Sequence, residues 1–197
     1  MTDLSQFAFS AAEGFDEPSM REAFSHAVPL RTVVIYCYDP RAARIPEIVA
    51  ERLGDIYPGK IILDDEGHKI ASTATIFPVI VAGGRAVDSL RSIAVAQHLF
   101  GIENIVVVHH SHCGATTFTA NGIIDAFRRE QGSDLSDAFP REALCIADYK
   151  RSLEDDVALL RNHPAVPRSA TLFGFFYEID SAELVLVSKD EARRSLG

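Results

Sequence analysis

The chain has 197 residues, enough for one domain of ordinary size, and 47% of them are hydrophobic, so a substantial core can form. Nineteen Lys and Arg residues against 28 Asp and Glu residues give a net charge of −9, which argues against binding to nucleic acid or anionic lipid. No apolar stretch reaches the roughly 18 residues of a membrane span, and the first residues lack the pattern of a signal peptide, so we expect a cytoplasmic protein.

Residues 1–28 predict an N-terminal arm rather than part of the core. Asp16-Glu17-Pro18 favours the start of a short helix there. A free arm would expose the apolar rings of its phenylalanines, so we expect the arm to lie at a subunit interface. These residues are Phe7, Phe9, Phe15 and Phe24. Residues 29–197 are then a single α/β domain.

Hydrophobic patterns along residues 29–197 predict strands that alternate with helices. Arg31–Cys37 and Asn104–His109 are short, β-branched and apolar on both faces, as strands buried in a parallel sheet are. Apolar residues at spacings of three and four over Ile146–Leu160 are typical of an amphipathic helix. The other expected strands are Lys60–Leu63, Ile76–Ala82, Leu172–Ile179 and Glu183–Val187, and the other expected helices are Pro46–Leu53, Val87–Phe100, a helix from Gly114 or Ala115 to about Glu130, and Lys189–Leu196. The alternation predicts a mainly parallel sheet flanked by helices, with an added hairpin strand near the end.

Two of the expected strands are followed by residues that can bind a metal. Cys37 ends the first strand, and His110 and Cys113 follow the strand at 104–109. Ligands of open α/β sheets bind beyond the carboxyl ends of the strands, so these side chains converge if the two strands are neighbours. Two thiolates and one imidazole are a ligand set for zinc that leaves its fourth position open. Cys113 also precedes an expected helix, whose N-terminus would favour the thiolate.

A structural interpretation stays open for each motif taken alone. A buried cysteine at a strand end is usually a small hydrophobic residue, and three cysteines fit a reducing compartment without a disulfide framework. Cys145, on the amphipathic helix, is expected to fill the core. His109 should face away from His110 across the strand and be structural, whereas His112 is either a proton carrier or a solvated loop residue.

The residues around these ligands resemble a known family. Cys37-Tyr38-Asp39-Pro40-Arg41 and His110-Ser111-His112-Cys113-Gly114 are similar to the two ligand motifs of the β-class carbonic anhydrases, whose relatives include carbonyl sulfide hydrolases. Ala82-Gly83-Gly84-Arg85 resembles the glycine-rich turn of that family, and residues 173–179 resemble its late strand. The likeness spans about Val33 to Val187.

The resemblance implies the β-carbonic-anhydrase fold and a Zn²⁺ ion bound by Cys37, His110 and Cys113, with residues 29–197 as the zinc-binding catalytic domain. It implies that Asp39 and Arg41 are catalytic, and the planar fork of the arginine would hold the carboxylate ionised and aimed at the solvent on zinc. The implied reaction is the reversible hydration of carbon dioxide to bicarbonate by zinc hydroxide, in a homodimer or homotetramer.

Two departures from the family pattern concern substrate choice and the surroundings of the site. Ile80-Val81 stand where the family usually has Arg-Asn, and we expect them to border the zinc pocket. The stretch between Arg41 and Ala82 is longer than in the family, and we expect its surplus at Leu63–Phe77 to form a hairpin or loop beside the site.

Several alternatives to carbon dioxide hydration remain open. The same zinc site would serve carbonyl sulfide hydrolysis, which a less polar pocket would suit, and carbon disulfide hydrolysis has less support. A zinc-binding module without catalysis would not need Asp39 and Arg41. A cysteine phosphatase would want an arginine soon after Cys113, and a dinucleotide site would want Gly-x-Gly-x-x-Gly; the sequence has neither pattern there.

Overall fold

A computed structural model describes residues 4–192 of the chain. The strands are Thr32–Cys37 (β1), Ile61–Leu63 (β2), Lys69–Ser72 (β3), Ile76–Val81 (β4), Asn104–His110 (β5), Thr171–Glu178 (β6) and Glu183–Asp190 (β7). The α-helices are Glu17–Ala27 (α1), Ile45–Leu53 (α2), Leu90–Phe100 (α3), Ala120–Gln131 (α4) and Tyr149–Asn162 (α5). Short 3-10 helices cover Leu4–Phe7, Phe9–Ala11, Pro40–Ala42, Ala82–Gly84, Ala86–Ser89, Gly114–Thr116 and Arg141–Ala143.

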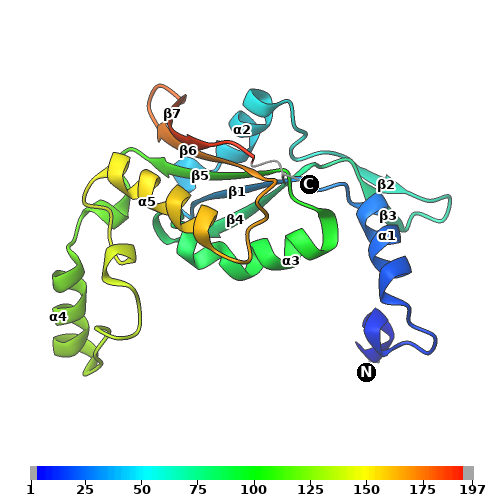
Figure 1. Cartoon of the computed structure of the whole chain (residues 1–197), viewed down its shortest axis with the longest axis horizontal. Helices are drawn as coiled ribbons and strands as arrows, with labels where there is room; N and C mark the ends of the chain where they lie inside the picture. The colour runs from blue at the N-terminus through cyan, green and yellow to red at the C-terminus, as the bar shows by residue number, and fades with distance from the viewer. Residues whose placement is uncertain (1–3, 193–197) are drawn as a thin grey trace.

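One sheet organises the molecule, with the strand order β4-β1-β5-β6-β7. The first four strands are parallel, and β7 runs antiparallel to β6. Helices α3 and α5 lie on one face of the sheet and α2 lies on the other (Figure 1). The expected α/β fold, with a mainly parallel sheet and a final hairpin strand, is confirmed.

The two ends of the sheet carry different additions. Strands β2 and β3 form a separate antiparallel hairpin that contacts α1, at the end where β4 begins (Figure 1). Helix α4 projects from the opposite end, beyond the carboxyl end of β5 (Figure 1). The expected hairpin in the long stretch after Arg41 therefore exists, but the expectation that it lies beside the site is wrong. The length of a segment does not determine toward which end of the sheet it folds.

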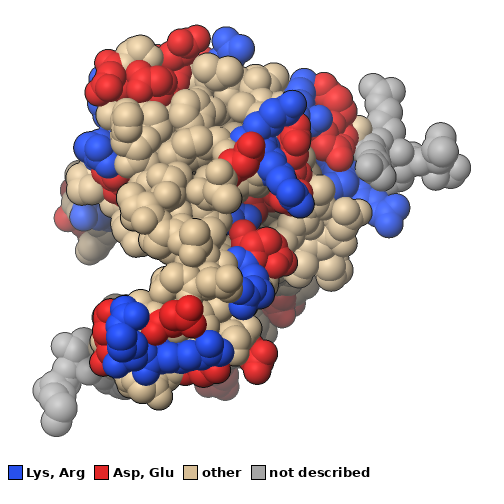
Figure 2. All heavy atoms as spheres, turned by 90° about the vertical axis from the view of Figure 1, so that its left-hand side faces the viewer, with Lys and Arg blue, Asp and Glu red and all other residues tan. Residues whose placement is uncertain are grey.

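Charged side chains of both signs are mixed on the surface. On the face shown in Figure 2, acidic and basic residues lie next to one another around a broad area of uncharged side chains. No helix within residues 4–192 has the length and apolar character needed to cross a membrane.

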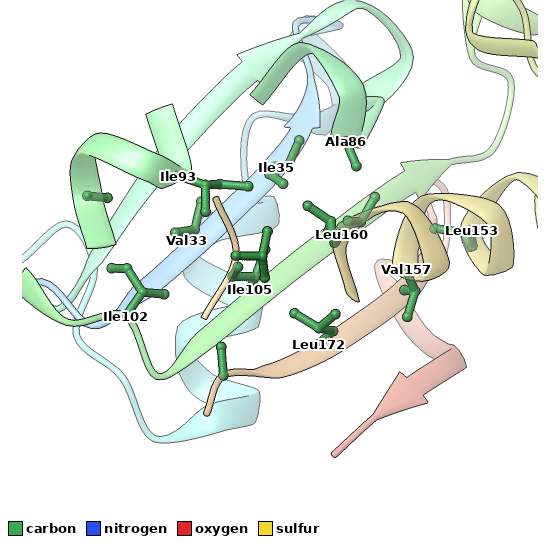
Figure 3. Packing of buried hydrophobic residues seen from close by; sticks show 14 residues of the cluster. Val33, Ile35, Ala86, Ile93, Ile102, Ile105, Leu153, Val157, Leu160 and Leu172 are labelled. Carbon is green, nitrogen blue, oxygen red and sulfur yellow. The ribbon is translucent and has the colours of Figure 1, made fainter. Parts of the chain in front are cut away.

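The central strands are buried on both faces, and successive residues alternate between two cores. Val33 and Ile35 of β1 pack with α3 and α5, and Leu153 and Val157 of α5 lie over the strands in Figure 3. The intervening residues of β1 and β5 pack with α2 on the other face, where the core includes Val34, Tyr36, Val106, Val108, Ile45 and Val49. This double burial explains the continuous apolar runs in the sequence.

Three expected boundaries differ from the structure. The segment after Cys113 first forms a 3-10 helix at Gly114–Thr116, and α4 begins only at Ala120, where the Thr119 side chain accepts a hydrogen bond from the Gly122 N–H. Helix α5 begins at Tyr149 behind its cap Asp148 rather than at 146. Strand β7 continues to Asp190, so the expected helix does not begin at 189, and residues 193–197 of that expectation lie outside the described residues.

Candidate metal centre

Three potential metal ligands meet at the carboxyl ends of two adjacent parallel strands. Cys37 is the last residue of β1, His110 is the last residue of β5, and Cys113 follows β5 by three residues. Their ligand atoms all lie within 4.8 Å of one another, and all three residues are buried. The structure thus brings together the three residues that the sequence predicted as a set, because β1 and β5 are neighbours in the sheet.

The geometry of this group fits zinc. The two sulfurs are 3.9 Å apart, close to the roughly 3.8 Å expected between two thiolates on one tetrahedral zinc ion. The His110 ring donates through Nδ1 to the Ser111 carbonyl at 2.9 Å, and its buried Nε2 has no hydrogen-bond partner among residues 4–192. A ring nitrogen with a free lone pair inside the protein is the state that metal binding uses.

The electrostatics of the group favour a bound cation. Burial, followed by the neighbouring Cys37, raises the pKa of Cys113 to about 11. Burial also lowers the pKa of His110, which keeps its ring neutral. The backbone N–H of Ala115, in the 3-10 helix after Cys113, lowers this pKa as expected of a helix N-terminus, but burial outweighs it. A divalent cation would reverse this balance, since a coordinated thiol ionises readily.

Asp39 and Arg41 form a bidentate pair beside the ligands. Arg41 donates to Asp39 through Nε at 3.0 Å and Nη2 at 2.6 Å, and the Arg41 backbone N–H donates to the same carboxylate. These hydrogen bonds, with the side chain of Arg41 as the largest cause, lower the pKa of Asp39 to about 2. Nη2 of Arg41 also donates to the His112 carbonyl at 3.0 Å, so the pair ties the two ligand segments together.

The glycine turn after β4 packs directly beneath the ligands. Gly84 has a φ of +69°, and a Cβ there would lie 2.6 Å from the Val108 carbonyl oxygen and 3.1 Å from the Tyr36 Cα. Only glycine permits this close approach to β1 and β5. The turn therefore needs glycine so that the 82–85 segment can close one side of the site.

A cavity of about 460 Å³ opens over the ligands. Cys37, Cys113 and Asp39 reach it, together with Asp88, whose pKa is raised by burial. Apart from Arg85, the rest of its wall is largely apolar and includes Tyr38, Pro40, Ala82, Ala115, Phe118 and Leu144. Such a wall suits a small uncharged molecule better than a hydrated ion.

The structure corrects two sequence-based positions. Ile80 is 53% exposed on the edge strand β4, and Val81 packs against the core, so neither lines the cavity. Val81 pairs with Cys37, so the end of β4 adjoins the ligand strand as expected, but the cavity wall begins only at the next residue, Ala82. Cys145 lies before α5 in a half-buried loop and lines the cavity, whereas the sequence placed it on a helix as a core residue.

The histidines beside the ligands have different surroundings. His109 faces α5, where its Nε2 lies 3.3 Å from an Asp156 carboxylate oxygen, so its predicted orientation away from His110 is confirmed. His112 has a φ of +56° and is exposed near Glu178 and Asp180. The Glu178 carboxylate already accepts hydrogen bonds from the Ser111 hydroxyl and the Ser181 N–H.

One buried charged pair near the cavity escaped the sequence analysis. Arg85 is 5% exposed and Asp156 is 1% exposed, and their side chains are 3.0 Å apart. Arg85 was recognised only as part of the glycine-turn motif, and its partner lies 71 positions later on α5. Nothing in the local pattern of either residue reveals the pairing.

No family model matches the chain, but individual proteins do. A carbon disulfide hydrolase from Acidithiobacillus thiooxidans is 26% identical in an alignment of length 119, and the match covers 52% of this chain and 59% of that protein. Beta-carbonic anhydrase 1 from Mycobacterium tuberculosis is 27% identical over 133 residues, which are 66% of this chain and 72% of that protein. The chain thus spans about three fifths of the length of the carbon disulfide hydrolase it matches.

Solved structures share the fold over nearly the whole chain. A carbonic anhydrase from Streptococcus mutans aligns with a TM-score of 0.61 at 24% identity, covering 95% of this chain and all of that one. The apo form of a carbon disulfide hydrolase aligns with a TM-score of 0.58 at 21% identity, covering 96% and 92%. The chain is therefore similar in sequence to carbon disulfide hydrolases and a β-carbonic anhydrase, and it has the fold of the solved β-carbonic anhydrases.

Proposed function

We propose that this protein is a zinc-dependent enzyme that adds water to a small linear substrate, with reversible hydration of carbon dioxide to bicarbonate as its reaction. The observation that carries the proposal is a group of three potential metal ligands, Cys37, His110 and Cys113, whose ligand atoms lie within 4.8 Å of one another. Two of them, Cys37 and Cys113, line the same cavity as Asp39, which Arg41 holds by two hydrogen bonds. Zinc held by the three ligands would supply Lewis acidity, which lets water ionise near neutral pH.

The roles of the other residues follow from their charge and hydrogen bonding. Asp39 is kept ionised by Arg41, so its carboxylate accepts a hydrogen bond from the attacking water and cannot donate one. This acceptor fixes the orientation of the water, leaving a lone pair directed at the substrate carbon. As the new C–O bond forms, electrons of one C=O bond move onto oxygen and the proton of the water passes to solvent.

Carbon disulfide hydrolysis is the second candidate. The apolar cavity wall would accept a sulfur substrate, and curated relatives named carbon disulfide hydrolases match the chain. Two waters would attack in succession, giving carbonyl sulfide and then carbon dioxide, with one hydrogen sulfide released at each step. Carbonyl sulfide is therefore both an alternative substrate and an intermediate of this second route.

A zinc-binding module without catalysis is the remaining alternative. It would have no use for a bidentate Asp39–Arg41 pair that reaches the ligand cavity, because an exposed ion pair contributes only about 0–1 kcal/mol to stability. The presence of the pair at the cavity therefore supports an enzyme over a purely structural site.

The test is one zinc-loaded preparation assayed in parallel with carbon dioxide, carbonyl sulfide and carbon disulfide. We expect the highest kcat/KM with carbon dioxide. A preference for carbon disulfide would establish the second candidate. Lack of turnover with all three substrates, in protein that holds one zinc per chain, would contradict the proposed enzyme class.

A further inference from the structure

Arg85 is a buried cation whose side chain donates hydrogen bonds in two directions, to three residues. Its Nε donates to Asp156 at 3.0 Å and its Nη2 donates to the same carboxylate at 3.2 Å. Its Nη1 donates in the other direction, to the carbonyls of Glu142 at 2.8 Å and Cys145 at 3.2 Å. The guanidinium thus links α5 to the loop that precedes it.

The two carbonyls enclose residues that form a wall of the ligand cavity. Ala143 and Leu144 lie between Glu142 and Cys145, and these two residues line the cavity together with Cys145. The far end of the segment is held by the Ile146 N–H, which donates to the Ala115 carbonyl at 2.9 Å. Residues 142–145, called the wall segment below, are therefore fixed at the cavity by contacts at both ends.

Asp156 sets the direction of the guanidinium. It lies on α5 between the core residues Leu153 and Leu160, and its carboxylate also accepts from the Ala86 N–H at 3.3 Å. His109 approaches the same oxygen at 3.3 Å. These contacts fix the position of the Asp156 carboxylate. The carboxylate in turn fixes the orientation of the Arg85 guanidinium, so that Nη1 points to the wall segment and donates to its carbonyls.

We propose that Arg85 is a positioning residue, whose guanidinium, oriented by Asp156, holds the wall segment against the cavity over the metal ligands. A core ion pair is weak support for stability, because apolar residues of similar volume often serve equally well. Arginine is needed here because the carbonyls of Glu142 and Cys145, at the start and end of the wall segment, require one hydrogen-bond donor that reaches both. The planar, forked guanidinium can donate to both while it also pairs with Asp156.

This inference rests on the proposed function only for its effect on catalysis. If the wall segment moves away, a small uncharged substrate loses part of its apolar surroundings, while the metal ligands and Asp39 stay on other elements. We expect KM to rise more than kcat falls. The position of the wall segment itself can be measured without any substrate.

The experiment measures how fast Cys145 reacts with a thiol reagent such as dithionitrobenzoate in zinc-loaded protein. Cys145 is half-buried within the wall segment, whereas Cys37 and Cys113 are 4% and 1% exposed, and peptide mass spectrometry identifies the labelled residue. In Arg85→Met/Asp156→Leu, both charges are removed together so that neither is left unpaired in the core. We expect zinc to be retained and Cys145 labelling to accelerate about tenfold or more, since hydrogen bonds to charged groups are stronger than average.

Two further variants keep the test decisive. Arg85→Lys retains the charge beside Asp156 but lacks the planar, forked guanidinium, and we expect a smaller, several-fold acceleration of Cys145 labelling. If the double variant does not fold, the result for Arg85→Lys alone decides the test. Arg151→Met removes an exposed arginine from α5, the helix that carries Asp156. In this control variant Cys145 should be labelled at the wild-type rate. Wild-type labelling in the folded Arg85 variants would overturn the inference. Missing turnover in the wild type would count against the proposed function and leave the labelling result standing.

Discussion

At the scale of single residues, the state of His110 shows why these three side chains suit a metal. Its Nδ1 donates to the Ser111 carbonyl, and its Nε2 is buried without a partner in the described part of the chain, a costly arrangement unless something binds there. The sulfurs of Cys37 and Cys113 lie within reach of the same point. The buried ligand atoms of three residues therefore converge on one point, where a bound cation would coordinate all of them.

We expect Cys113→Ser to lose its zinc. Serine replaces a thiolate ligand by a hydroxyl that ionises far less readily, and the remaining two ligands hold the metal weakly. Elemental analysis of purified protein should give one zinc per wild-type chain and nearly none in the variant. Cys145→Ser is the matched control and should keep its zinc. Equal zinc in Cys113→Ser and wild type would remove Cys113 from the ligand set.

We expect Asp39→Asn to lower kcat/KM on the order of a hundredfold while zinc content stays unchanged. Asparagine has almost the same shape but can donate as well as accept, so the orientation of the attacking water is lost. Stopped-flow hydration assays measure the effect. Asp65→Asn, in the exposed turn between β2 and β3, is the control and should be as active as wild type. Undiminished turnover in Asp39→Asn would show that the carboxylate has no part in the reaction.

At the scale of elements, the turn between β4 and α3 depends on one glycine. We expect Gly84→Ala to lower the free energy of unfolding by about 2–4 kcal/mol, because it adds a Cβ 2.6 Å from a carbonyl oxygen in a left-handed conformation. Gly132→Ala is the matched control, since Gly132 has a φ of +65° and open space around it, so only about 1 kcal/mol of backbone strain applies. Urea denaturation of both variants checks this. Equal losses would mean that the close approach costs nothing.

The buried contact between His109 on β5 and Asp156 on α5 should make the stability of the fold sensitive to acid. Burial lowers the pKa of His109, and the pKa of Asp156 is also lowered because hydrogen bonds and the charge of Arg85 outweigh its burial. The unfolded chain therefore binds more protons than the folded one, first below about pH 6.5 at His109 and then below about pH 4 at Asp156. We expect the unfolding free energy to fall as pH falls through these ranges. The slope between pH 7.5 and 5.5 should be shallower in His109→Asn; identical slopes would contradict this account.

The sequence allowed the strands and the ligand set to be predicted, because both depend on local patterns. Cys37 and His110 end apolar strands and Cys113 follows three residues later, so predicting the strands also located these residues. The surroundings could not be predicted in this way. Arg85 and Asp156 meet across 71 positions, and the place of Cys145 depends on where α5 begins. These features are decided by packing between helices and the sheet, which no single segment encodes.

At the scale of the whole molecule, the N-terminal arm has few neighbours within its own chain. Helix α1 touches α3 through Phe24 and Phe100, whose rings are 5.8 Å apart, and through a contact between Glu17 and His98. Beyond it, Phe7 and Phe9 are 66% and 58% exposed, and Figure 1 shows this part of the arm projecting away from the sheet. So much exposed aromatic surface on a monomer is typical of a surface that another subunit covers.

We therefore expect the full chain to form a homodimer or larger oligomer and Phe7→Ser/Phe9→Ser to shift it toward monomer. The double variant removes apolar area that a second subunit would bury, at roughly 25 cal/mol per Å². Size-exclusion chromatography with light scattering measures the mass at several protein concentrations. The matched control is Ile61→Ser/Leu63→Ser, which removes two equally exposed apolar residues from the hairpin at the same end of the molecule. A monomeric wild type, or a loss of association in the hairpin variant alone, would show that the arm is not the interface.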